Sequence, residues 1–219
     1  MQLSFSAEQK TALLRPGRDD GPEALGDALA ALPDTDDVRA VVLSISGSLG
    51  PAGKEGECDW LERFVLPAVA ALSGTVDGRA LDLALACDMR VCDAATVIRF
   101  GAVGGRRSLA LLGEAGSLEL LRLGLRLDAE AALRLGVVSA VAQAGASERE
   151  ALELAATIAS RGPIATRLAK EAVWQGLELP LAHALRFETD LTLLLQTTKD
   201  RAEGVAAFLE KRTPRFTGN

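Results

Sequence analysis

The stretch "ALSGTVDGRALDLALACDMRV", residues 71–91, decides the fold. It begins as an apolar run typical of a buried strand, breaks at two glycines, and continues as a second apolar run with helical spacing. The break carries Asp77 and Arg79, and the second run carries a single acid, Asp82. Charged residues at the joint between a buried strand and a helix need a reason, and most of what the sequence indicates about function depends on it.

The first half of the chain alternates strand and helix patterns around this joint. Apolar runs predict strands at residues 11–16, 38–46, 67–74, 89–94 and 96–103, and helical patterns occur at 21–34, 59–65 and 80–87. This alternation predicts an α/β fold in which a largely parallel sheet is covered by helices.

The second half is almost entirely helical. Asp128 and Gly136 are the expected caps of a short helix, and Ser147 with Glu150 is read as a capping box. Further helices are expected near 164–176, 180–197 and 199–211. We expect a core over residues 1–145 and a helical region over 146–219.

Composition excludes several classes of function. The 219 residues carry a formal net charge of -6, which argues against a nucleic-acid partner. Neither a signal peptide nor a membrane span is found, so we expect no membrane association and a cytoplasmic location. The three cysteines form no C-x-x-C pair and are expected to be buried free thiols. His183 is the single histidine and lies in an Ala/Leu-rich helical pattern, so no metal site is expected.

Several strings, in order along the chain, resemble the enoyl-CoA hydratase/isomerase (crotonase) family. They are "DDVRAVVLSISG", "PAVAALSGTVDGRALDLALACDMRVCDAATVIRFG", "DAEAALRLGVVSAVA" and "EGVAAFLEKRTPRFTG". The resemblance covers about Arg15 to Gly218. It implies a crotonase-like fold, in which repeated ββα units form the core sheet and a helical C-terminal region mediates oligomerisation and coenzyme A contacts.

The resemblance implies an acyl-CoA thioester as substrate, with coenzyme A as part of that substrate and no separate cofactor. Two backbone N–H donors then stabilise the negative charge that develops on the thioester oxygen. By position, Gly78 begins the turn and the Arg79 amide is one donor, whereas the other is expected within residues 49–54. The family normally has glycine where this chain has Arg79. Its side chain either pairs with an anionic ligand or partner, or forms a structural ion pair with Asp77 or Asp82.

Two carboxylates often act as acid and base in this family. The first maps onto Asp82, which is either an acid–base group or a buried partner of Arg79 or Arg90. The second maps near Gly104, which has no carboxylate, and Glu114 is the nearest substitute or else only a helix N-terminal charge. A hydratase needs both groups to activate water, so the altered pair argues against ordinary hydration.

The remaining implied contacts concern coenzyme A and partners. Arg15, Lys54 and Lys211, with Arg212 and Arg215, are expected to meet its phosphates, and Phe208 its adenine. The apolar C-terminal helices suit a trimer or hexamer. A shortened segment between Gly47 and Leu66 implies an open pocket, or one that another chain completes.

Within the family, short chains that lack the usual carboxylates resemble the auxiliary crotonase-like proteins of 3,5-dihydroxyphenylglycine biosynthesis. That resemblance implies a type III polyketide synthase as partner and assistance in forming 3,5-dihydroxyphenylacetyl-CoA. Two alternatives stay open, an ordinary fatty-acyl enoyl-CoA hydratase/isomerase and a non-catalytic activator of a synthase.

Overall fold

A computed structural model describes residues 1–18, 20–32, 37–47, 49, 57–100, 111–114, 116–118 and 126–219. Its main sheet has the strand order β1-β2-β3-β4-β6-β9, and only the β1–β2 pair is antiparallel. The strands are β1 Gln2–Ser6, β2 Thr11–Arg15, β3 Ala40–Ser46, β4 Ala68–Ser73, β6 Met89–Asp93 and β9 Ala140–Ala142. The expected α/β architecture with a largely parallel sheet is confirmed.

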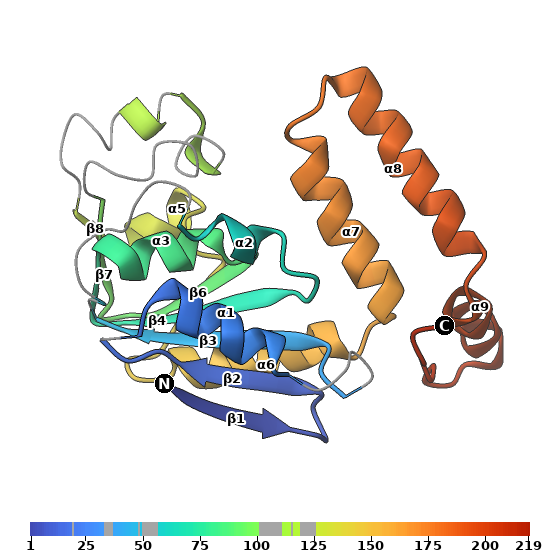
Figure 1. Ribbon diagram of the computed structural model, residues 1–219, viewed down its shortest axis with the longest axis horizontal. Coiled ribbons are helices and arrows are strands. Elements are labelled where there is room, and N and C mark those ends of the chain that lie inside the picture. The colour runs from blue at the N-terminus through green and yellow to red at the C-terminus, as the bar shows by residue number, and fades with distance from the viewer. Residues whose placement is uncertain are drawn as a thin grey trace.

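One face of this sheet carries a helical layer and a small second sheet (Figure 1). The helices are α1 Pro22–Ala30, α2 Asp59–Glu62, α3 Gly78–Ala86 and α5 Ala129–Arg134. The second sheet has the order β5-β7-β8, formed by Thr75–Val76, Val97–Arg99 and Arg126–Asp128. The buried side chains of α3 pack on alternate residues of β3 and β4, including Leu43, Ile45 and Leu72. This packing fixes α3 directly over the centre of the sheet.

Helix α6, Ser147–Ala159, covers the opposite face of the main sheet. Its alanines at 151, 155 and 159 recur every four residues, so they form one stripe of small side chains. That stripe packs on Val42, Val69 and Val91 of the central strands. The sheet is therefore buried on both faces, as the near-continuous apolar strands require.

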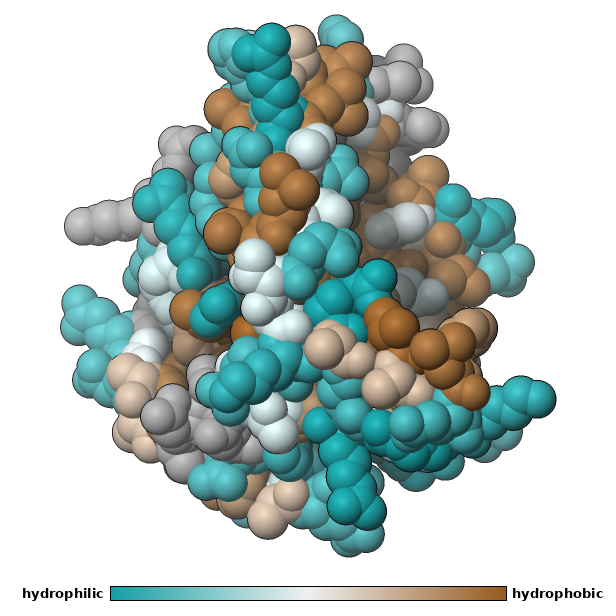
Figure 2. Space-filling view, turned by 90° about the vertical axis from the view of Figure 1, so that its right-hand side faces the viewer, coloured by the Kyte–Doolittle hydropathy of each residue, from teal (hydrophilic) through white to brown (hydrophobic). Residues whose placement is uncertain are grey.

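The last three helices form an arm that extends from the core (Figure 1). They are α7 Pro163–Gly176, α8 Leu181–Gln196 and α9 Lys199–Glu210. Apolar side chains gather in patches on this side of the molecule (Figure 2). The exposed ones in the arm are Val173, Leu177, Leu179, Leu181, Leu185, Leu193, Leu194, Val205, Phe208 and Leu209. An arm with this much exposed apolar surface needs a partner surface.

Several local predictions can be compared with these elements. The Asp128 side chain accepts a hydrogen bond from the Ala131 N–H at 2.7 Å, which confirms the cap of α5. The predicted capping box of α6 is wrong, because its N-cap is Ala146 and no side chain caps it. The three cysteines are buried and free, as expected. No helix among the described residues is long and apolar enough to cross a membrane.

Candidate active site

The loops that follow β3 and β4 meet at the carboxyl edge of the sheet. The Gly47 N–H donates to the Ser73 carbonyl at 2.9 Å, and both Gly47 and Gly74 have positive φ angles, of 72° and 70°. A Cβ added to Gly74 would lie 3.7 Å from the Gly47 nitrogen. That distance is an ordinary contact, so glycine is favoured at both positions by the left-handed backbone and not by lack of space.

Helix α3 starts at this edge with unpaired amides. Gly78 has φ of 48°, a left-handed conformation that favours glycine, and Asp77 before it is extended. The Leu81 N–H donates to the Asp77 carbonyl at 3.3 Å, so the amides of residues 78–80 precede the helical hydrogen-bond ladder. The Asp77 side chain makes no cap hydrogen bond. The N-terminus of α3 thus has backbone donors and a positive dipole end suited to a developing oxyanion.

Asp82 lies on the next turn of α3 and is only 8% exposed. Apart from Asp82, all residues of the helix from Ala80 to Ala86 are apolar. The structural alternative, in which Asp82 is the partner of Arg90, does not hold. The Arg90 guanidinium instead donates to the carbonyls of Val137, Cys87 and Ala84, at 2.6, 2.7 and 3.3 Å. These contacts lie around the other end of α3, and burial lowers the pKa of Arg90 there.

The Arg79 side chain lines a cavity of about 600 Å³ between α1, α2 and α3. Glu23 and Asp27 of α1, Glu57 and Trp60 also line it. Arg79 Nε is buried and has no hydrogen-bond partner. None of the ion pairs between described residues joins Arg79 to Asp77 or Asp82.

Arg15 lies on the wrong face of the sheet for this cavity. Side chains alternate along β2, so Arg15 points to the same side as Leu13, which packs with α6. Its guanidinium makes two hydrogen bonds to Glu148, at 2.6 and 2.9 Å. The hydrogen bond from Arg15 is the main cause that lowers the pKa of Glu148, and it raises that of Arg15. Arg15 is thus engaged in holding α6 to the sheet, and the predicted phosphate contact would have to break this pair.

The other predicted site residues are dispersed. Lys54 and Gly104 lie outside the described residues, as does the 50–54 part of the first-donor loop. Glu114 is exposed at the end of a short helical segment. Phe208 and Lys211 lie on α9 and at its C-cap, exposed at the end of the arm. In the fold, neither of these two residues contacts a site on α3 of the same chain.

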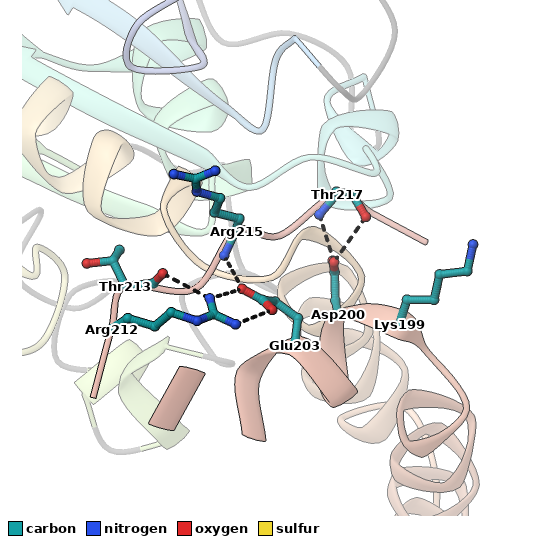
Figure 3. Close-up of a pocket in the computed structure, with 7 residues that line it drawn as sticks. All are labelled: Lys199, Asp200, Glu203, Arg212, Thr213, Arg215 and Thr217. Carbon is teal, nitrogen blue, oxygen red and sulfur yellow. Dashed lines mark hydrogen bonds and ion pairs between the residues drawn. The ribbon is translucent and has the colours of Figure 1, made fainter. Parts of the chain in front are cut away.

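The basic C-terminal residues surround a separate cavity of about 760 Å³ (Figure 3). Arg212 donates to both carboxylate oxygens of Glu203, at 2.6 and 2.8 Å, and the Arg215 N–H donates to the same group at 2.7 Å. Asp200 accepts the backbone N–H groups of Thr217 and Gly218. The side chain of Arg215 points away from this cluster (Figure 3). Through its hydrogen bonds to Glu203, Arg212 therefore holds the residues that follow α9, here called the tail, against that helix.

Comparison with known proteins places this geometry in a family. The enoyl-CoA hydratase/isomerase family profile matches residues 54–219. The chain belongs to this family. It is 37% identical over 169 residues to the probable mitochondrial enoyl-CoA hydratase 2 of Arabidopsis thaliana, an alignment covering 73% of this chain and 56% of the relative. It is 38% identical over 168 residues to the mitochondrial methylglutaconyl-CoA hydratase of Rattus norvegicus, covering 70% and 53%.

Solved structures of the enoyl-CoA hydratase/isomerase family match the whole chain. The enoyl-CoA hydratase of Bacillus anthracis superposes with a TM-score of 0.86 at 28% identity and covers 100% of both chains. A further structure, described as a putative enoyl-CoA hydratase of Streptomyces coelicolor, gives 0.83 at 28% identity and covers 99% and 94%. The crotonase-like fold is confirmed. The chain aligns with less than two thirds of the length of the curated relatives it matches.

The sequence alone did not reveal that two acidic residues of α1, Glu23 and Asp27, line the same cavity as Arg79. Glu23 and Asp27 are four residues apart, so they project from one face of α1. This spacing was visible in the sequence, but an acidic pair on an amphipathic helix ordinarily faces solvent. Only the placement of α1 across from α3 brings the pair to the cavity.

Proposed function

We propose that this chain binds an acyl-CoA thioester and stabilises its enolate at the N-terminus of α3. The observation that carries the proposal is the set of unpaired amides at residues 78–80, beside the loop that leaves Gly47, with the buried Asp82 on the following turn. Membership of the enoyl-CoA hydratase/isomerase family supports the choice of substrate class. In this proposal the Arg79 amide donates to the thioester oxygen, and a second amide comes from the loop after β3.

Asp82 is the acid–base group in this mechanism. Enolate formation requires a proton to leave the carbon beside the thioester carbonyl, and a carboxylate at the entrance of the oxyanion site is suited to accept and return it. The position near Gly104 has no second carboxylate in the sequence. One acid–base group suffices for a proton shift, or for an elimination in which the proton that it accepts from carbon is passed on to the leaving hydroxyl group. We therefore propose a lyase or isomerase reaction.

The finer proposal concerns the acyl group and a partner. We propose that the substrate is a polyketide thioester made by a type III polyketide synthase, which the protein helps to dehydrate and aromatise to 3,5-dihydroxyphenylacetyl-CoA. The replacement of glycine by Arg79 at the oxyanion turn and the missing carboxylate support a substrate other than a simple enoyl chain. In the elimination of water, the oxyanion site stabilises the enolate, and the one acid–base group accepts the carbon proton and returns it to the leaving hydroxyl group; enolisation follows.

The Asp82→Asn variant tests the catalytic role. It keeps the size of the side chain and removes its ability to accept a proton, so we expect conversion of a synthase product to fall by about 100-fold or more. Glu130→Gln, an exposed change on α5, is the matched control and should leave conversion unchanged. If Asp82→Asn stimulates a synthase as well as the wild type does, the protein is a non-catalytic activator.

An ordinary hydratase is the second candidate function. The names of some matched relatives favour it, because curated proteins of 37–38% identity are named a probable enoyl-CoA hydratase and methylglutaconyl-CoA hydratases. Hydration of crotonyl-CoA, followed by loss of the enoyl absorbance, separates the two. Turnover of at least about one per second, within the range of ordinary enzymes, would favour the hydratase over our proposal.

A further inference from the structure

The cavity between α1, α2 and α3 has an unusual combination of charges. Among the described residues that line it, Glu23, Asp27 and Glu57 carry carboxylates and Arg79 carries a guanidinium. Trp60 adds an aromatic surface. Arg79, the second residue of α3, lines this cavity, so an acyl group whose carbonyl is bound by the Arg79 amide would have these side chains within reach.

Arg79 Nε is a donor already removed from water. It is buried, and no acceptor lies within hydrogen-bond distance. A buried donor without a partner is costly, and an oxygen atom of a ligand would recover that cost. The guanidinium therefore favours a ligand with an acceptor oxygen close to the thioester.

Three classes of acyl group can be compared on these grounds. An alkyl chain would leave Arg79 Nε without an acceptor and would offer no hydrogen-bond donor to Glu23 and Asp27. A chain that ends in a carboxylate would satisfy Arg79 but would meet the acids of α1 at close range, where like charges repel. A neutral chain with keto and hydroxyl groups has acceptors for Arg79 and donors for Glu23 and Asp27. Only a neutral chain with keto and hydroxyl groups can therefore hydrogen-bond both Arg79 and the acids of α1.

We propose that Arg79 and the acidic face of α1 select a neutral, oxygen-rich acyl group, of the β-keto or β-hydroxy kind, over alkyl and carboxylate-bearing groups. The inference rests on the proposed acyl-CoA function and names its substrate class. Arg79 acts here through its side chain, separately from the oxyanion role of its amide.

Binding of three thioesters with four-carbon acyl groups tests the selection by calorimetry. The probes are acetoacetyl-CoA, butyryl-CoA and succinyl-CoA, with free coenzyme A as reference. We expect acetoacetyl-CoA to bind about tenfold more tightly than butyryl-CoA, the effect of one buried hydrogen bond that is made or left unmade. Succinyl-CoA should bind no better than butyryl-CoA. Equal binding of the three, or succinyl-CoA as the tightest, overturns the selection but leaves the proposed function intact. If none of the thioesters binds, both the selection and the proposed function are wrong.

Two variants assign the effect to its residues. Arg79→Met keeps an unbranched side chain of similar length and should weaken acetoacetyl-CoA about tenfold while butyryl-CoA is not weakened. Glu23→Gln with Asp27→Asn changes two exposed positions, so folding is retained even if Arg79→Met does not fold. This double variant should tighten succinyl-CoA severalfold. If the double variant still binds succinyl-CoA as weakly as the wild type does, the acidic face of α1 is not the cause of that weak binding.

Discussion

Burial gives two cysteines pKa values far above that of an ordinary thiol. Desolvation raises the pKa of Cys87 to about 12 and that of Cys92 to about 11. Since the thiolate is the reactive form, we expect neither to react with an aromatic disulfide reagent at about pH 8 while the protein is native. Both should react after denaturation. Intact mass measured before and after labelling checks this, and rapid labelling of the native protein at either position would contradict it.

At the end of the arm, Glu203 has its pKa lowered to about 2, mainly by hydrogen bonds from Arg212 and also by the Arg215 N–H. A carboxyl group with a lowered pKa stabilises the fold above its ordinary pKa of 4.5, and that contribution is lost as the pH falls towards 2. Arg212→Gln should move the pKa of Glu203 back towards 4.5, as followed by carbon-detected NMR titration. Arg201→Gln on the same helix is the control. A wild-type value near 4.5 would show that the tail is not held in this way.

At the scale of the element, local patterns predicted most helices because their apolar spacing agrees with the side they bury. The capping box predicted for Ser147 and Glu150 failed because α6 begins one residue earlier than the box requires. Ala146 is the N-cap, so Ser147 is already the first helical residue. Strand β1 was not predicted, since it is an exposed edge strand whose identity depends on pairing with β2.

Helix α7 is held to the core through one carboxylate. Asp88 accepts from the Ala68 N–H, Lys170 Nζ and Trp174 Nε1, at 2.7, 2.8 and 3.0 Å. Asp88→Ala removes the ion-pair partner of the Lys170 ammonium, which is only 9% exposed and keeps only its hydrogen bond to the Leu66 carbonyl among the described contacts. We expect the free energy of unfolding to fall by about 3–5 kcal/mol, measured by urea denaturation with tryptophan fluorescence.

The control for Asp88→Ala lies on the exposed side of the same helix. Glu171 hydrogen-bonds Gln175 there, so Glu171→Ala should change the free energy of unfolding by no more than about 0.5 kcal/mol. Equal effects of the two variants would mean that Asp88 does not anchor the arm.

For the molecule as a whole, the part of the candidate site that could be predicted is continuous along the chain. The family resemblance pointed to Gly78, Arg79 and Asp82, and the three residues lie on one helix. Sequence could not show that α1 faces α3 across a cavity, or that Arg15 points to the other face of the sheet. Those facts follow from strand order and from the alternation of side chains along β2.

The exposed apolar surface of the arm predicts self-association. Leu181 and Leu185 of α8 are 75% and 55% exposed, and burying such side chains between chains stabilises an assembly by about 25 cal/mol per Å² of apolar surface. We expect a trimer or hexamer in analytical ultracentrifugation. Replacing both leucines by glutamate should yield smaller species, because the assembly would bury unpaired charges. Arg149→Glu on α6 is the control and should sediment as the wild type does. A monomeric wild type at micromolar concentration would mean that the arm has a different partner, and a type III synthase would then be the first candidate to mix with it.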